Sequence, residues 1–153
     1  MPIDPAHVGR ADEPMSLLVD AGRLRFFAKA TGQADPVYRD EVAAAAAGHP
    51  GLPVPPTFMF GIAMEAAEPF GYLTELGVDL GSLLHGTQSF DYHRMAYAGD
   101  TLTLNRRISD IYQKKGGALE FVVHESTVTN QRDELVATLL ATSVIQHRQG
   151  ASS

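Results

Sequence analysis

The second half of this chain contains three segments in which apolar and polar residues alternate, and no other feature constrains the fold as much. The segments are residues 102–108, 119–124 and 135–145. A period of two is typical of β-strands, because successive side chains point to opposite faces of a sheet. Turn residues precede or separate the segments at Gly99-Asp100, Lys114–Gly117 and Asn130–Asp133. Consecutive strands with short turns predict an antiparallel sheet, and Ser89–Tyr92 is a further strand candidate before it.

The first half of the chain has helical patterns instead. Ala21–Ala30 places Leu24, Phe27 and Ala28 on one face, with Asp20 as N-cap and Gly32 as the C-terminal stop. A second helix is expected from Pro36, capped by Asp35, through the alanines 43–47 to Gly48.

A third helix is expected at Thr57–Glu68, which is apolar on nearly every side until Pro69 ends it. A helix that is apolar all round is a buried helix. The sequence therefore predicts an α+β protein in which an antiparallel sheet packs on this helix. We expect one domain over residues 1–153, with an extended arm at 1–15 and a flexible tail at 147–153.

Composition excludes several classes of protein. The chain has 153 residues and a formal net charge of -6, and its Lys and Arg are scattered, so we expect no nucleic-acid binding. It has no Cys, and none of its six His has a metal-ligand spacing, so we expect no metal. The N-terminus lacks a signal-peptide pattern and no apolar run reaches the ~20 residues of a membrane span, which predicts a cytoplasmic protein without membrane contact.

Two motifs carry a family resemblance. Residues 27–38 read Phe-Ala-Lys-Ala-Thr-Gly-Gln-Ala-Asp-Pro-Val-Tyr, which resembles the signature loop of MaoC-like enoyl-CoA hydratases and dehydratases. Residues 85–100, from His-Gly-Thr-Gln to Ala-Gly-Asp, are similar to the N-terminal, fatty-acid-synthase-like dehydratase domain found in mycobacterial heterodimeric acyl dehydratase subunits. The resemblance spans about residues 21–146 and implies the hot dog fold, a curved antiparallel sheet wrapped around one central helix.

The resemblance also implies a reaction: hydration of a trans-2-enoyl thioester of CoA or acyl carrier protein, or the reverse dehydration, with no cofactor. Pockets of the family form between subunits, which implies a homodimer or a heterodimer. The family's active loop has the form Gly-Asp-x-Asn-Pro-x-His. This chain has Gln33 for the Asp, Asp35 for the Asn and Tyr38 for the His, and keeps Pro36. Gln33 cannot accept a proton near neutral pH, and Tyr38 is a poor substitute for imidazole.

Two interpretations remain open. In the first, the chain is the substrate-binding subunit of a heteromer whose MaoC-like partner supplies the Asp and His. In the second, the chain is catalytic by itself through displaced groups, namely Asp35, Tyr38, His85 or His93. Two further functions differ in class: a non-catalytic acyl-CoA binding subunit, and a hot dog thioesterase that uses a carboxylate such as Glu65 or Asp35.

Each candidate also has a structural interpretation. Asp35 fits a helix N-cap, and Glu65 fits the polar edge of its helix, although a buried Glu65 would have a raised pKa. His85 and His93 share a face only if their strand is unbroken, and a regular strand directs Tyr92 and Arg94 away from His93. The basic residues 106, 107, 114 and 115 are either CoA phosphate contacts or solvated strand edges. The substrate-binding candidates are Gln33, Pro56, Thr57, Phe58, Phe60, Gly61 and Arg94.

Overall fold

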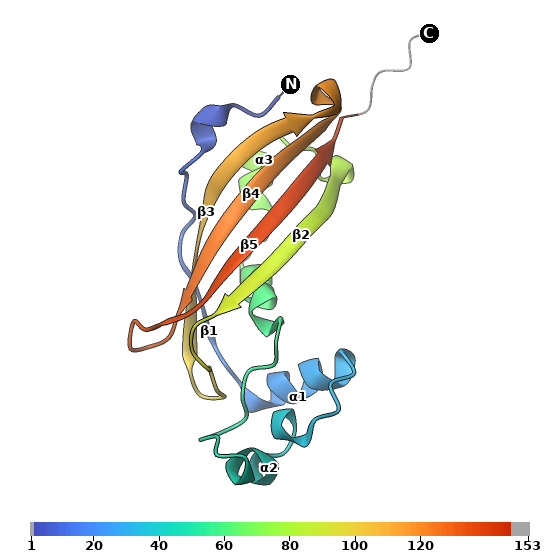
Figure 1. The fold of residues 1–153 in the computed structure, drawn as a ribbon. Helices are drawn as coiled ribbons and strands as arrows, with labels where there is room; N and C mark the ends of the chain where they lie inside the picture. The colour runs from blue at the N-terminus through green and yellow to red at the C-terminus, as the bar shows by residue number, and fades with distance from the viewer. Residues whose placement is uncertain (1, 148–153) are drawn as a thin grey trace.

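A single curved sheet forms the body of the molecule (Figure 1), and the computed structural model describes residues 2–147. Its five strands are antiparallel and lie in the order β1-β3-β4-β5-β2. The strands are β1 (Met15–Leu18), β2 (Leu83–Tyr92), β3 (Thr101–Lys114), β4 (Leu119–Thr129) and β5 (Leu135–Gln146). The α-helices are α1 (Ala21–Ala30), α2 (Glu41–Ala46) and α3 (Gly71–Glu75). The 3₁₀ helices are η1 (Pro5–His7), η2 (Pro36–Tyr38), η3 (Phe58–Glu65), η4 (Leu80–Ser82) and η5 (Lys115–Gly117).

The three long strands predicted from the alternating pattern are confirmed as β3, β4 and β5. Their turns have the backbone geometry that glycine permits: Gly99 has φ 95° and Gly117 has φ 92°. The fourth strand, β2, is longer than predicted because it begins at Leu83, and β1 is an additional strand that pairs with β3. The expected antiparallel sheet with helices on one face is therefore correct.

The helix at 21–30 is confirmed as α1, and the Asp20 side chain accepts a hydrogen bond from the Arg23 N–H at its start. The predicted continuous helix from Pro36 to Gly48 is wrong. After η2 the backbone becomes extended at Asp40 (φ -122°, ψ 120°), whose side chain accepts a hydrogen bond from Val42 N–H and starts α2. A second capping residue thus restarts the helix within the predicted one.

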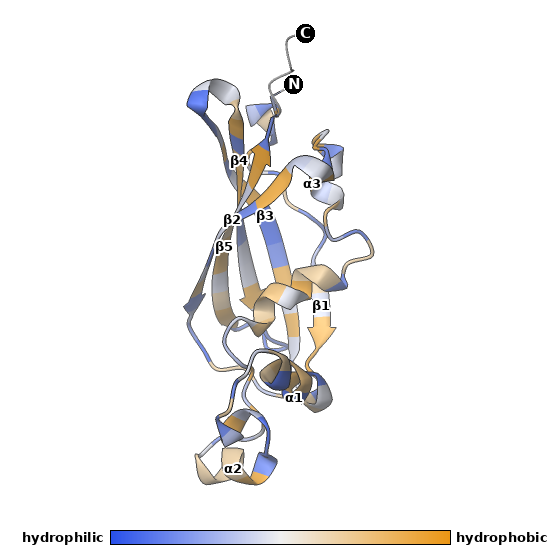
Figure 2. Ribbon diagram, turned by 90° about the vertical axis from the view of Figure 1, so that its right-hand side faces the viewer, coloured by the Kyte–Doolittle hydropathy of each residue, from blue (hydrophilic) through white to orange (hydrophobic). Residues whose placement is uncertain are grey.

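The central helix is also shorter than predicted, because η3 covers Phe58–Glu65 as a 3₁₀ helix. Phe58, Met59 and Ile62 are buried against the sheet, but Phe60 and Met64 remain 40% and 38% exposed. Figure 2 shows this helix crossing the helix-covered face of the sheet with no second layer over it. Complete burial of the central helix was therefore a wrong prediction for the isolated chain, since only one side of η3 contacts the sheet.

The N-terminal arm is more ordered than the sequence indicated. Gly9 N–H donates to the Ile108 carbonyl at 2.8 Å, and Ala11 forms a β-bridge with Arg107, so the arm continues along the free edge of β3. Ile3 is buried beside Glu120. The predicted tail lies almost wholly outside the described residues.

The residues buried between sheet and helices form two apolar clusters. One contains Leu104, Val128 and Leu139 with the buried side of η3, and the other contains Ile108 and Val122. Among residues 2–147, no helix is long and apolar enough to cross a bilayer.

Candidate functional site

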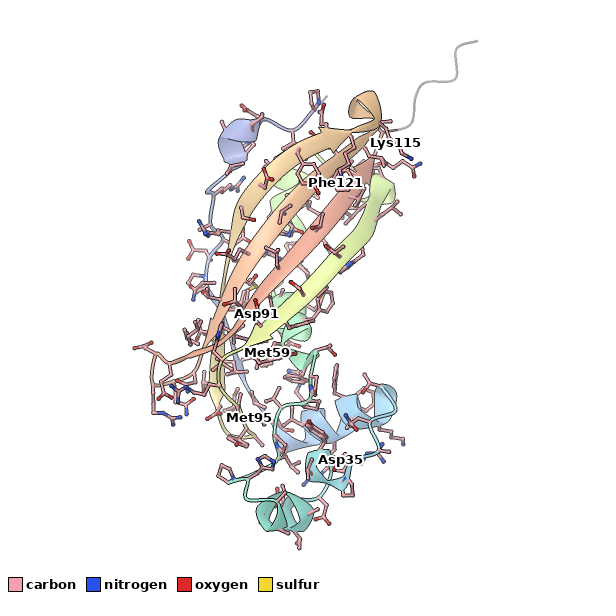
Figure 3. The ribbon with its side chains drawn as sticks, in the orientation of Figure 1. Asp35, Met59, Asp91, Met95, Lys115 and Phe121 are labelled. Atoms are coloured by element: carbon pink, nitrogen blue, oxygen red, sulfur yellow. The ribbon has the colours of Figure 1, made fainter. Side chains whose placement is uncertain are left out.

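A groove of about 350 Å³ lies where the chain enters η3 and leaves β2. Pro56 and Met59 line it from the η3 side, Tyr38 lines it from η2, and the segment after β2 forms the remaining wall. Figure 3 labels Met59 and Met95, which both line this groove. The groove therefore collects residues from three separate parts of the sequence.

Tyr92, His93 and Arg94 all line this groove, contrary to the prediction that a regular strand keeps them apart. The reason is that β2 ends at Tyr92. His93 N–H and Arg94 N–H then both donate to the carbonyl of Val136, at 2.8 and 3.2 Å. When two successive N–H groups bond to one carbonyl, their side chains no longer point to opposite faces as they do in a strand. The side chains of consecutive residues can therefore line the same groove.

Most polar groups of the groove already have partners. His93 Nε2 lies 3.1 Å from the Thr138 hydroxyl, and Arg94 lies 3.6 Å from the Glu134 carboxylate. The Tyr92 hydroxyl accepts a 2.9 Å hydrogen bond from Thr57 N–H. The N–H at position 57 is thus engaged by the sheet.

The loop at residues 27–38 uses its polar side chains locally. Gln33 Oε1 accepts a 3.2 Å hydrogen bond from Asp35 N–H, and Asp35 Oδ1 accepts one from Val37 N–H at 3.1 Å. Asp35 is therefore the N-cap of η2, as its structural interpretation required. It is exposed, does not line the groove, and lies among the helices below the sheet (Figure 3). Tyr38 alone among the loop's polar candidates reaches the groove.

Glu65 lies on the surface, where it forms an ion pair with Arg23 of α1. The hydrogen bond and charge of Arg23 lower the pKa of Glu65 below its ordinary value. The hypothesis of a buried Glu65 with a raised pKa is therefore wrong, since the side chain is 41% exposed and charge-paired.

His85 does not share the groove with His93. A β-bulge between His85 and Thr87 shifts the pairing of β2 with β5, which breaks the even spacing that would place both His on one face. Gly86 occupies the bulge because a Cβ there would come within 2.8 Å of the Thr142 carbonyl. His85 instead lies beside Phe60, with 5.8 Å between ring centroids.

A second cavity, of about 90 Å³, lies between η3 and the sheet. Phe60 and His85, both predicted site residues, line it, whereas Phe58 is in the core and Gly61 is half-buried on η3. Arg106, considered above as a CoA phosphate contact, also lines it, together with His124 and Tyr72, which were not selected from the sequence. The available signal was that His124 and Ser126 lie between Val122 and Val128 in the alternating pattern, on the face that these valines bury.

Arg106 belongs to this interior and not to a basic patch. Its guanidinium bonds to Asp12 at 2.5 Å and lies 4.1 Å from the centroid of the Tyr72 ring. Arg107 points to the other face of the sheet and pairs with Glu125 at 2.8 Å. The four basic residues at 106, 107, 114 and 115 therefore do not form one phosphate contact. Within residues 2–147, no cluster of three or more His, Asp or Glu is placed to hold a metal ion.

Solved structures with a similar fold identify the class of protein to which this fold belongs. The chain resembles a MaoC-like dehydratase structure with a TM-score of 0.82 at 28% identity, over 94% of this chain and 43% of that longer one. It also resembles the C-terminally truncated HadBC (3R-hydroxyacyl-ACP dehydratase) complex of Mycobacterium tuberculosis, with a TM-score of 0.76 at 27% identity, over 90% and 96% of the two chains. The ChsH1-ChsH2 complex of the same organism shares the fold at a TM-score of 0.75 and 23% identity, over 92% and 91%. The molecule thus has the hot dog fold of the MaoC-like dehydratases, as the sequence predicted.

Sequence comparison gives the family. The family model of the FAS1-like dehydratase domain region matches residues 6–139. A UPF0336 protein of Streptomyces coelicolor is 40% identical over 76% of this chain and 78% of its own length, and a UPF0336 protein of Saccharopolyspora erythraea is 34% identical over 94% and 92%. The chain belongs to the FAS1-like dehydratase-region family.

Proposed function

We propose that this chain is the substrate-binding subunit of a cytoplasmic acyl-thioester hydratase or dehydratase, and that a MaoC-like partner subunit supplies the catalytic Asp and His. One observation carries the proposal. In the loop where the active family pattern has those two residues, this chain has Gln33 and Tyr38, and the loop's one carboxylate, Asp35, is used as the N-cap of η2.

The chemistry explains why a partner is needed. Hydration of an enoyl thioester requires a base that activates water at Cβ and an acid that delivers a proton at Cα, and the efficient groups titrate near neutral pH. An amide does not titrate, and a phenol has an ordinary pKa of about 10. A separate subunit that carries a carboxylate and an imidazole completes such a site. That the similar HadBC and ChsH1-ChsH2 structures are two-protein complexes supports this arrangement.

The groove supports the substrate-binding role. It combines apolar surface from Val54, Met59 and Met95 with the polar tips of Tyr38, His93 and Arg94. Such a mixture suits an acyl thioester, whose chain is apolar and whose CoA or phosphopantetheine part is polar and anionic. Arg94 is 52% exposed and its 3.6 Å contact with Glu134 is a weak surface pair, so its charge is available to a phosphate.

A second candidate function is catalysis by this chain alone. The observation that favours it is that Tyr38 and His93 line the same groove. The thioesterase alternative has less support, because Glu65 is paired with Arg23 and Asp35 caps a helix. The remaining alternative is a subunit that binds acyl-CoA but belongs to no active enzyme. It differs from the leading proposal only because its complex with a partner would not hydrate the substrate.

The deciding experiment incubates the full chain with crotonyl-CoA, alone and together with the subunit of the same organism that carries the intact Gly-Asp-x-Asn-Pro-x-His loop. Enoyl absorbance reports hydration, and free thiol reports thioester hydrolysis. We expect loss of enoyl absorbance only in the mixture, without thiol release. Hydration by the chain alone supports the second candidate, thiol release supports a thioesterase, and an inert mixture contradicts all three enzymatic functions.

A further inference from the structure

A row of polar side chains crosses the helix-covered face of the sheet between the two apolar clusters. We call it the polar row. Its members are His85 and Gln88 of β2, Arg106 of β3, His124 and Ser126 of β4, and Ser143 of β5. The strand register places them together: Arg106 is opposite Ser126, and His85 is opposite Ser143. Residues on this face on either side of the row are apolar, including Leu104 and Ile108. The row is therefore a polar interruption of a hydrophobic core.

The cavity of about 90 Å³ lies directly over the polar row. Phe60, Ala63 and Met64 of η3 form its other wall. Phe60, Met64 and Phe70 line it while remaining 40%, 38% and 41% exposed. The cavity therefore has an apolar entrance formed by partly exposed side chains and a polar floor, which is the arrangement of a ligand pocket.

One polar group of this floor, the imidazole of His124, has a ring nitrogen without a hydrogen-bond partner. The residue is only 4% exposed, and its Nε2 is buried without any hydrogen-bond partner among the described residues. Burial, with a smaller contribution from the positive charge of Arg106, lowers the pKa of His124 to about 4. The imidazole is thus neutral at pH 7, with one nitrogen a donor and the other an acceptor. A buried polar atom without a partner is rare and destabilising in a native protein.

The side chains next to His124 do not form a hydrogen bond with its Nε2. Tyr72 packs edge-on against the imidazole, with ring centroids 4.5 Å apart and an interplanar angle of 87°. Arg106 already donates to Asp12. Because Asp12 also balances the Arg106 charge, the pocket offers no free positive charge to a ligand carboxylate. A neutral ligand group is favoured.

We propose that this cavity receives the chain of an acyl thioester that carries a hydroxyl group beyond the reacting carbons, and that this hydroxyl bonds to His124 Nε2. A hydroxyl is both donor and acceptor, so it satisfies either tautomer of the imidazole. A plain alkyl chain would fill the cavity but leave Nε2 unpaired. This inference rests on the proposed function, because it names the substrate class of the same subunit.

The competing occupant is water. At roughly 30 Å³ for each liquid water, the cavity has room for about three molecules. Water bound to His124 would make the polar row a solvated structural feature, without preference for hydroxylated chains. The test must therefore compare ligands that differ only in the hydroxyl group.

The experiment measures binding to the full chain by titration calorimetry, with octanoyl-CoA and with the 6-, 7- and 8-hydroxyoctanoyl-CoA isomers. We expect one isomer to bind roughly tenfold more tightly than octanoyl-CoA, as one additional hydrogen bond in a buried site permits. The variant H124F removes the hydrogen-bonding atom and should abolish the preference. The control H7F makes the same substitution in the N-terminal arm and should keep it.

Equal affinity for all four thioesters overturns the inference and leaves the proposed function intact. A preference that persists in H124F also overturns it. If no thioester binds, the proposed function fails and the inference fails with it. Should H124F not fold, the comparison of isomers on the unmodified chain decides alone.

Discussion

The Tyr92 hydroxyl accepts a 2.9 Å hydrogen bond from the backbone N–H of Thr57, which joins the end of β2 to the start of η3. Thr57 has φ 71°, the left-handed conformation that non-glycine residues rarely adopt. Phe60, three residues further on, contacts His85 near the start of β2. The start of the short helix is therefore attached to β2 at two points, the Thr57 backbone and the Phe60 ring.

The Tyr92–Thr57 bond predicts a measurable effect on stability. Tyr92→Phe removes the acceptor, and we expect it to lower the free energy of unfolding by about 1 kcal/mol in urea denaturation. Tyr112→Phe is the matched control, because the Tyr112 ring stacks on Phe121 and, among the described residues, its hydroxyl has no hydrogen bond. Equal stability of the two variants would show that the bond contributes nothing.

Burial of His124 predicts a dependence of stability on pH. Its pKa is about 4 in the folded chain, against an ordinary value of 6.5 for an unfolded chain, which therefore binds more protons between these values. The contribution of His124 is complete above pH 6.5 and is lost as pH falls toward 4, by up to about 3 kcal/mol. Urea denaturation between about pH 7.5 and about pH 4.5 should show a flatter profile for His124→Gln than for the unmodified chain. His7→Gln, as control, should leave the profile unchanged, and identical profiles for all three proteins would refute the prediction.

Because Asp12 and Arg106 form an ion pair, we expect substitutions of the two residues to have non-additive effects on the free energy of unfolding. The Arg106 side chain is only 11% exposed, so Asp12→Ala leaves a largely buried charge without its partner. We expect a loss of about 3 kcal/mol in the free energy of unfolding. Arg106→Met replaces the charge with apolar volume, and the double variant should regain most of that loss. Additive effects of the two substitutions in denaturation experiments would contradict the coupling.

The ion pair of Glu65 predicts a pH effect in the acid range. Arg23 lowers the pKa of Glu65, so the ion pair stabilises the fold above the ordinary carboxyl pKa, and its contribution is lost as pH falls through the lowered value. Glu65→Gln should be less stable than the unmodified chain at pH 7, and the difference should vanish in strong acid. Glu68→Gln is the control, since no ion pair of Glu68 is found in residues 2–147. A difference that persists in acid would exclude the ion pair as its cause.

Because Tyr38 and His93 line the same groove, substitutions at these two positions distinguish catalysis by the partner's groups from catalysis by this chain alone. If the partner supplies the catalytic groups, Tyr38→Phe and His93→Gln should change kcat of the assembled enzyme by less than about tenfold. If either residue is the general acid or base, its loss should reduce kcat roughly 10²- to 10⁴-fold. Hydration of crotonyl-CoA is the measurement, and Tyr97→Phe, outside this groove, is the control.

Much of the fold was readable from local pattern. The alternation in β3, β4 and β5, the glycine turn between β3 and β4, and Asp20 as the cap of α1 act over a few residues, so the sequence predicts them directly. The break between η2 and α2 was not predicted, because Asp40 caps a helix only if the chain becomes extended there, and alanine propensity argued for continuity.

The site depended on contacts that no local pattern records. The sequence by itself determined the family, the order of the strands along the chain and the presence of Gln33 and Tyr38 where the family pattern has Asp and His, since these follow from residue identity and spacing. The tertiary structure decided that Glu65 meets Arg23 at the surface, that the end of β2 brings Tyr92, His93 and Arg94 together, and that His124 faces the interior. The physical reason is that a period of two fixes which side chains share a face, while pairing with neighbouring strands decides which face meets the helices.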